Sequence, residues 1–221
     1  RMEGNGNDEK AANNATSTTG VTFSTGNGRY GQGAGFASAS SSAIVLPNNA
    51  SLRINGPMTV GGWMKVDSIP NTTAHLYTQY EEIGYASGWN CAVAASDSKF
   101  HASIFDNISI GNYLTSSMTM VDSIWRLVVI TCDGSNMKLY VNGKFDVSVS
   151  QTFTVVCGST IYPRIGVEAR DGVNRYFFNG AIDDVFLFSR ALSAGENWAI
   201  FDDLRPKYLR MNQSIVRSNY Y

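Results

Sequence analysis

The chain has 221 residues, with 17 Lys and Arg against 18 Asp and Glu, so its formal net charge is -1. A protein that binds nucleic acid through the phosphates normally carries a basic excess, and this balance argues against that class. The hydrophobic content of 43% supplies a core and argues against wholesale disorder, and no apolar run approaches the ~20 residues that a membrane-spanning helix needs.

The first 35 residues are rich in Gly, Asn, Ser and Thr, which predicts loops broken by short strands at 21–23 and 34–36. The start, Arg1-Met2-Glu3, does not resemble a signal peptide and reads like the interior of a strand. We therefore expect the chain to be a mature or excised piece of a longer protein.

Strand-like runs recur from residue 43 onward, with turn signals between them. Asp133-Gly134 and Asn142-Gly143 predict tight turns at the two ends of one such run. The spacing of about 8–14 residues between strands, without helical crossovers, favours an antiparallel sandwich or barrel. The strands are expected at 43–46, 58–66, 75–80, 89–95, 100–105, 124–132, 137–141, 160–166 and 176–189.

One helix is expected near the C-terminus. Ser193-Ala-Gly-Glu196 fits a capping box, and Pro206 ends the helix. Its apolar face consists of Trp198, Ile200, Phe201 and Leu204.

The last residues, 206–221, mix aromatic with basic side chains and contain no acid. We expect an extended tail there, separate from the domain at 1–205, that docks on a neighbouring chain. The predicted partner-docking residues are Tyr208, Arg210, Arg217, Tyr220 and Tyr221.

The three cysteines, Cys91, Cys132 and Cys157, have no CxxC spacing, which argues against a zinc site or a thioredoxin-type motif. Cys91 and Cys132 stand in strand-like runs, so we expect buried free thiols. One disulfide with a spare thiol is the alternative.

Five runs follow one another along the chain. They are Met2-Glu-Gly-Asn-Gly-Asn-Asp8, Arg29-Tyr-Gly-Gln-Gly-Ala-Gly-Phe36, Met58-Thr-Val-Gly-Gly-Trp-Met-Lys-Val66, Trp125–Gly134 with Lys138–Gly143, and Phe178–Phe188 with Arg190–Ser193. Together they resemble the laminin G-like, or concanavalin A-like, jelly-roll superfamily. The resemblance implies an all-β antiparallel sandwich with one short C-terminal helix. Because this fold hosts lectins, glycanases and structural modules, it implies little about function by itself.

Glycanases with this architecture place paired carboxylates on one strand, typically as E-x-D-x-x-E, so that alternate acids share a face. The sequence has no such triad. Glu81 and Glu82 are adjacent and would point to opposite faces of a strand, and Glu168 and Asp171 flank an expected turn. We therefore predict a protein without catalytic residues.

The resemblance also implies a calcium site, because members often hold Ca²⁺ between an acid of the last long strand and groups near the N-terminal strand. These positions map onto Asp183 and onto Glu3, Gly4 and Asn5. A buried carboxylate without a partner is costly, and calcium is one partner that would satisfy Asp183. Hydrogen bonds from turn amides or from an arginine are the alternative.

Sugar rings present C–H patches that pack on aromatic faces, while amides and carboxylates bind the hydroxyls. Aromatic residues cluster around the expected hairpin at 75–95. The predicted ligand-binding residues are Tyr77, Tyr80, Glu81, Tyr85, Trp89, Asn90 and Tyr113. Core or edge packing is the alternative for about half of these rings, and Tyr162 is a further candidate.

Two functions fit these observations. The first is a non-catalytic recognition module, at an extracellular or virion surface, that binds a glycan or cell-surface polysaccharide. The alternative is a decoration or assembly subunit of a virion or extracellular filament, whose tail docks on other protein chains. Sequons weakly indicate a secreted glycoprotein, and they start at Asn14, Asn49, Asn71, Asn107 and Asn212.

Overall fold

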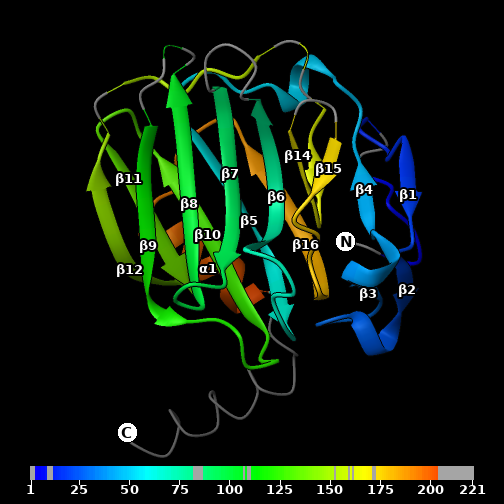
Figure 1. Ribbon diagram of the computed structural model, residues 1–221. Coiled ribbons are helices and arrows are strands. Elements are labelled where there is room, and N and C mark those ends of the chain that lie inside the picture. Colours follow the sequence, from blue (N-terminus) through cyan, green and yellow to red (C-terminus); the bar gives the residue numbers. More distant parts are fainter. Residues whose placement is uncertain are drawn as a thin grey trace, which may run out of the picture.

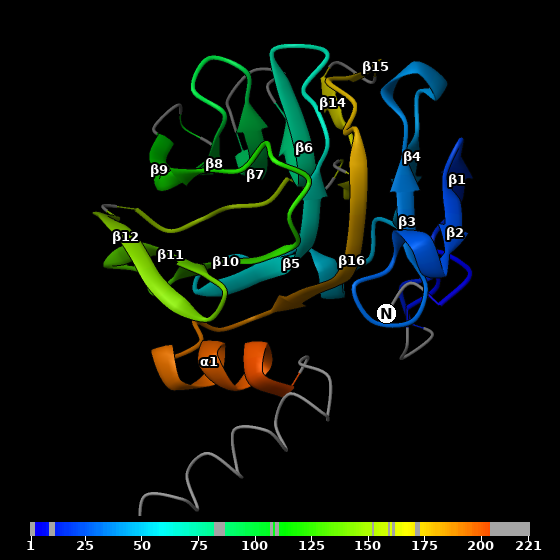
Figure 2. The same cartoon turned by 90° about the horizontal axis from the view of Figure 1, so that it is seen from below.

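The computed structural model describes residues 3–8, 12–81, 87–106, 108, 111–151, 153–158, 160, 162–170 and 173–203. Within them, two antiparallel sheets of seven strands each pack face to face, and one α-helix lies outside the pair (Figures 1 and 2). This β-sandwich is consistent with a jelly roll and confirms the predicted fold class.

The first sheet, sheet A, has the strand order β1-β4-β13-β6-β7-β8-β9. In that order its strands span Ser17–Thr19, Ala43–Val45, Arg164–Ile165, Thr73–Glu81, Ser87–Ala94, Lys99–Asp106 and Gly111–Thr119.

The second sheet, sheet B, has the order β12-β11-β10-β5-β16-β3-β2. Its strands span Lys144–Ser150, Asn136–Val141, Arg126–Cys132, Met58–Val66, Gly180–Phe188, Gly33–Phe36 and Thr22–Ser24. A separate hairpin pairs β14 (Glu168–Arg170) with β15 (Val173–Arg175), and short 3-10 turns occupy Thr25–Asn27, Ser38–Ser40 and Ala50–Leu52.

The main core lies between the two sheets. Because successive residues of a strand point to opposite faces, every second residue enters this core. On β8 these residues are Phe100, Ala102 and Ile104, and on β10 Val128, Ile130 and Cys132 face them from the other sheet. Burying a large apolar side chain contributes roughly 1.5–3 kcal/mol, so this interior holds the two sheets together.

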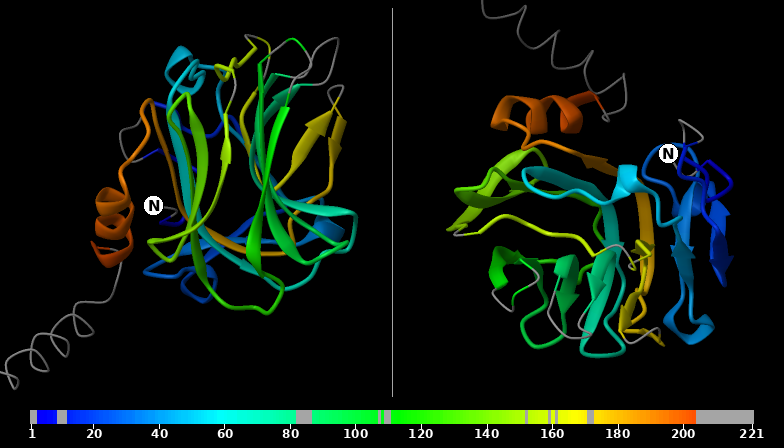
Figure 3. Two further views of the ribbon diagram at one scale, coloured as in Figure 1. Left: turned by 90° about the vertical axis from the view of Figure 1, so that its left-hand side faces the viewer. Right: turned by 90° about the horizontal axis from the view of Figure 1, so that it is seen from above.

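The helix α1 (Ala194–Asp203) covers the outer face of sheet B and makes a third layer (Figures 2 and 3). The rings of Phe201 and Trp63 lie 5.8 Å apart in a second buried cluster. Trp198 contacts Phe201 but is 42% exposed, so it packs less fully than expected. In the described part of the chain, no helix has the length and apolar character to cross a membrane.

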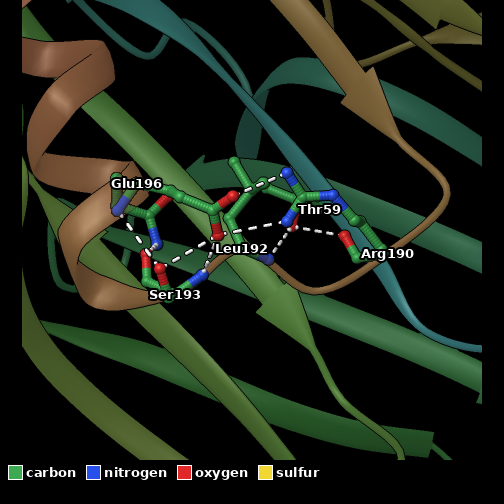
Figure 4. A network of polar contacts seen from close by, with 6 residues as sticks. Thr59, Arg190, Leu192, Ser193 and Glu196 are labelled. Carbon is green, nitrogen blue, oxygen red and sulfur yellow. Dashed lines mark hydrogen bonds and ion pairs between the residues drawn. The ribbon is translucent and has the colours of Figure 1, made fainter.

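A hydrogen-bond network fixes the turn before α1 (Figure 4). Thr59 Oγ1 donates to the Arg190 carbonyl at 2.8 Å and accepts the Leu192 N–H at 2.9 Å. The expected capping box forms, because the Ser193 N–H donates to Glu196 at 2.8 Å and the Glu196 N–H donates to Ser193 Oγ at 3.3 Å. Arg190 adds a two-pronged ion pair to Glu196.

Thr59→Val is expected to lower the free energy of unfolding by roughly 2 kcal/mol. The substitution keeps the shape of this fully buried side chain but leaves the Arg190 carbonyl and the Leu192 N–H without their partner. Urea unfolding measures the loss. Thr18→Val, on exposed β1, is the control and is expected to change stability little. Equal losses in the two variants would contradict the role of Thr59.

The cysteines are free and buried, as expected. Burial raises the pKa of the Cys132 thiol to about 12 and that of Cys91 further. The thiolate is the reactive form, so these side chains act as small apolar residues.

Several strands were not predicted. They are β1, β9, β12 and the hairpin β14–β15. β1, β9 and β12 are edge strands, and β1 and β12 expose most of their side chains, so their apolar alternation is weak. The expected strand at 160–166 is reduced to the two residues of β13.

Candidate functional site

The outer face of sheet A carries a line of five side chains, one from each of five neighbouring strands, which we call the central row. Arg164 pairs with Thr78, Thr78 with Asn90, Asn90 with Ser103, and Ser103 with Tyr113. Directly paired residues of neighbouring strands lie on the same face. The row therefore runs across the strands rather than along one of them.

The neighbours of these residues in sequence show which way the row faces. Ile165, Ile104 and Leu114 each lie next to a member of the row, and all three are buried in the core between the sheets. Alternation then places the row on the side away from sheet B. Figure 3 shows α1 and the hairpin β14–β15 on opposite sides of the sandwich, so the helix does not cover this face.

Three rings, one of them Tyr113 of the central row, lie together at its end, and we call them the aromatic ridge. The Tyr80 and Phe105 ring centroids are 4.9 Å apart, and the Phe105 and Tyr113 centroids 5.9 Å apart at an interplanar angle of 84°. Tyr113 is 67% exposed, Tyr80 is half-buried and Phe105 is buried between them. The ridge therefore presents aromatic surface to solvent beside hydrogen-bonding side chains.

Two glycines allow the ridge to form. Gly88 of β7 pairs with Tyr80 of β6 on one side and with Phe105 of β8 on the other. Gly111 of β9 pairs with Phe105 from the opposite side of β8. A Cβ atom at Gly111 would stand 2.7 Å from the Phe105 ring and 3.0 Å from the Tyr113 hydroxyl. Glycine at this position lets the two rings meet.

The hairpin β14–β15 bounds the face beside β6 (Figure 1). His75 of β6 is buried there, with its ring stacked on Tyr176 at 6.1 Å between centroids. Burial lowers the pKa of His75 to about 3, so the imidazole stays neutral at physiological pH. Thr78 is also covered, because its hydroxyl donates to the Val167 carbonyl at 2.9 Å. The open part of the row is thus the stretch from the half-buried Asn90 to the exposed Tyr113, with Ser103 between them only 6% exposed and Arg164 half-buried at the far end.

Three of the predicted ligand-binding residues, Tyr80, Asn90 and Tyr113, meet on this face. Tyr77 and Trp89 do not. Both are buried in the core, with their rings stacked at 6.4 Å and 10°, so packing is the correct reading for these two. The Glu81 side chain and Tyr85 lie outside the described residues.

Sequence reasoning missed Phe105, Ser103 and Arg164 as members of this face. Phe105 and Ser103 can be placed on the same face as Tyr113 and Asn90 only when the pairing register of β8 with β7 and β9 is known. Arg164 pairs with Thr78 across a sequence separation that no local pattern encodes.

Two of the residues expected at calcium, Asp183 and Glu3, hydrogen-bond the loop at 28–32. Asp183 is fully buried, and its carboxylate accepts the Arg29 N–H at 3.0 Å and the Asp184 N–H at 2.8 Å. Glu3 accepts the Gln32 N–H at 3.0 Å. Turn amides thus hydrogen-bond the buried acid. Burial and the charge of Asp184 raise the pKa of Asp183 to about 6.

Gly4 and Asn5 line a shallow, open depression of about 460 Å³ beside β1 and β2. Among the residues that the structure describes, no three His, Cys, Asp or Glu side chains gather, but Ca²⁺ also takes backbone and amide carbonyl oxygens. Calcium at Asp183, Glu3, Gly4 and Asn5 therefore stays a prediction.

The predicted docking residues of the tail lie outside the described residues, so the assembly alternative also stays a prediction. These residues are Tyr208, Arg210, Arg217, Tyr220 and Tyr221.

Solved structures with the same fold include several binding domains. The binding domain of Paraclostridial Mosquitocidal Protein 1 aligns with a TM-score of 0.68 at 18% identity, over 86% of this chain and 48% of that one. The binding domain of botulinum neurotoxin DC, solved with rat synaptotagmin II, has a TM-score of 0.67 at 15% identity, over 87% and 48%. This chain thus spans about half of the toxin domains it matches.

Domain 4 of AbnA, an extracellular arabinanase of Geobacillus stearothermophilus, was solved in complex with arabinotriose. It aligns with a TM-score of 0.60 at 17% identity, over 84% of this chain and 81% of that one. At these identities the likeness concerns the fold alone. The comparison with curated proteins gave no match. The model of the concanavalin A-like lectin/glucanase superfamily matches residues 38–196, and the chain belongs to that superfamily.

Proposed function

We propose that the chain is a non-catalytic carbohydrate-binding module of an extracellular or virion surface protein, and that the outer face of sheet A holds the glycan. The observation that carries this proposal is the aromatic ridge beside the central row. Exposed rings of this kind suit the C–H faces of sugars. Asn90 supplies an amide that sugar hydroxyls pair with, and the nearly buried hydroxyl of its partner Ser103 lies beside it.

The open stretch of the row, from Asn90 to Tyr113, covers two strand spacings, which is roughly 10 Å. Arg164 lies two further spacings away, beyond the covered Thr78. A glycan that crosses the strands would meet rings at one end and polar groups along its length. The family and the structural neighbours support a binding module, and one of those neighbours was solved with an arabinan fragment.

Tyr113→Ala is expected to weaken glycan binding roughly tenfold. The exposed ring is lost while Leu114 and the rest of β9 keep their places in the core. A glycan array with the full chain finds the ligand, and isothermal titration of the variant measures the loss.

The matched control is Phe145→Ala, which removes another exposed ring (56%, against 67% for Tyr113) from β12 of sheet B. It is expected to leave binding unchanged. A wild-type chain that binds no glycan, or equal losses in both variants, would overturn the proposal.

A further inference from the structure

Arg164 is a half-buried cation on the proposed binding face. Its Nη1 donates to the Tyr162 carbonyl at 2.9 Å, and its buried Nε has no hydrogen-bond partner. Two other arginines are paired: Arg126 lies 2.5 Å from Asp122, and Arg190 lies 2.6 Å from Glu196. Among the described residues, no carboxylate forms an ion pair with Arg164.

The surrounding face does not balance this charge. Neither the central row nor the two rows beside it contain an acid on β6, β7, β8 or β9. His101, which stands in one of these rows, contacts Asp97 at 3.0 Å. The positions in these rows are Tyr80, Gly88, Phe105 and Gly111, then Thr78, Asn90, Ser103 and Tyr113, then His75, Ala92, His101 and Thr115. Among the described residues of these three rows, no acid offsets the positive charge of Arg164, and Glu168 of the bounding hairpin interacts with Arg175.

Such an arrangement is expensive for the protein alone. Removing a guanidinium from water without an opposing charge costs free energy, and a well-packed apolar side chain in its place is often neutral or stabilising. Burial lowers the pKa of Arg164, in line with that cost. A bound anion would supply the missing partner.

We propose that Arg164 binds an anionic group of the ligand, so that the module takes acidic glycans that carry carboxylate or sulfate. This inference rests on the proposed function. The planar guanidinium fork offers two parallel donors, a geometry that matches a carboxylate or sulfate.

The position of Arg164 relative to the aromatic ridge fits this assignment. Arg164 pairs with Thr78, and Tyr80 lies two residues further along the same strand. Such diagonal neighbours are about 7–8 Å apart, within reach of long side chains. A sugar ring stacked on Tyr80 can therefore place its charged substituent at the guanidinium. Acid recognition and ring stacking then act on one glycan.

Paired polymers test the charge requirement with the full chain. Polygalacturonate is compared with its methyl ester, and dextran sulfate with dextran, so that each charged polymer has a neutral counterpart and the two arms separate carboxylate from sulfate. We expect at least one charged polymer to bind about tenfold or more tightly than its counterpart, and the preference to weaken with added salt.

Variants then assign the preference to Arg164. Arg164→Gln is expected to reduce the affinity for the charged polymer to that for its neutral counterpart. Arg164→Lys is expected to have an intermediate affinity for the charged polymer. Lys144→Gln, which removes the same charge from exposed β12 of sheet B, is expected to have no effect. Arg164→Met is expected to lose the preference and to keep or raise the urea midpoint, whereas a purely structural arginine would lower it.

The outcomes separate the two proposals. Equal binding of charged and neutral polymers, with the Tyr113 dependence intact, would overturn the acidic-glycan inference and leave the proposed function standing. Equal losses in Arg164→Gln and Lys144→Gln would also overturn the inference. Failure to bind any glycan would overturn the proposed function itself.

Discussion

Gly88→Ala is expected to cost on the order of 4 kcal/mol of the free energy of unfolding. Gly88 has a φ of +86°, and a Cβ atom there would stand 1.7 Å from the Gln79 carbonyl oxygen. The strand cannot retreat easily, because the Gly88 N–H donates to the Val156 carbonyl at 2.7 Å. The variant therefore has to break the pairing of β6 with β7 at the aromatic ridge.

A second glycine separates the two causes of this loss. Gly134 has a similar φ of +90°, but a Cβ atom there would meet nothing within 4 Å. Gly134→Ala is therefore expected to show the backbone strain alone, about 1 kcal/mol. Urea unfolding of both variants measures the difference. If the two lose the same amount, the close approach to Gln79 has no energetic weight.

The second large effect is a pH dependence from Asp183. Its pKa is raised from 3.8 to about 6 by burial and by Asp184, so between those values the folded chain holds a proton that the unfolded chain has released. Stability from this group is therefore present at low pH and is lost as the pH rises through about 6. The shift corresponds to about 3 kcal/mol.

The comparison with Asp183→Asn isolates this contribution, because the variant has no titrating group at the site. Asp97, Asp122 and Asp133, whose pKa values are lowered, titrate in both chains and cancel in the difference. We expect the stability of the native chain, relative to the variant, to fall by about 3 kcal/mol between pH 3 and pH 7. A constant or rising difference would show that Asp183 does not titrate as described.

The same pair of chains tests the calcium prediction. If Ca²⁺ binds the Asp183 carboxylate, millimolar calcium at pH 7 raises the melting temperature of the native chain and not that of Asp183→Asn. An equal response of both chains, or none, would count against calcium at this position. The hydrogen bonds from Arg29 and Asp184 are present in either case.

Much of the fold follows from the sequence, because its strongest patterns belong to central elements. Met58–Val66 is β5 residue for residue, and the capping box at Ser193 marks the start of α1. β9 was missed because only Leu114 and Ser116 are buried on it, so that few apolar residues mark its alternation. Edge strands give weak signals for this reason.

The site was harder to predict, because it depends on which way alternate residues face. A bulge between His75 and Tyr77 shifts the register of β6 against β7. Leu76 and Tyr77, which are adjacent at the bulge, therefore both enter the core, while Tyr80, an odd number of residues after Tyr77, points outward with Asn90. Periodicity alone does not reveal a bulge, and a slip of one residue exchanges the two faces.

The central row also separates the proposed binding surface from the folding core. Each of its members alternates with residues that enter the core, and each comes from a different strand. Asn90, Ser103 and Tyr113 can thus be substituted independently of one another and of the core residues. A library that randomises them leaves the interior sequence untouched, so the same sandwich offers a scaffold on which new sugar specificities can be selected one strand at a time.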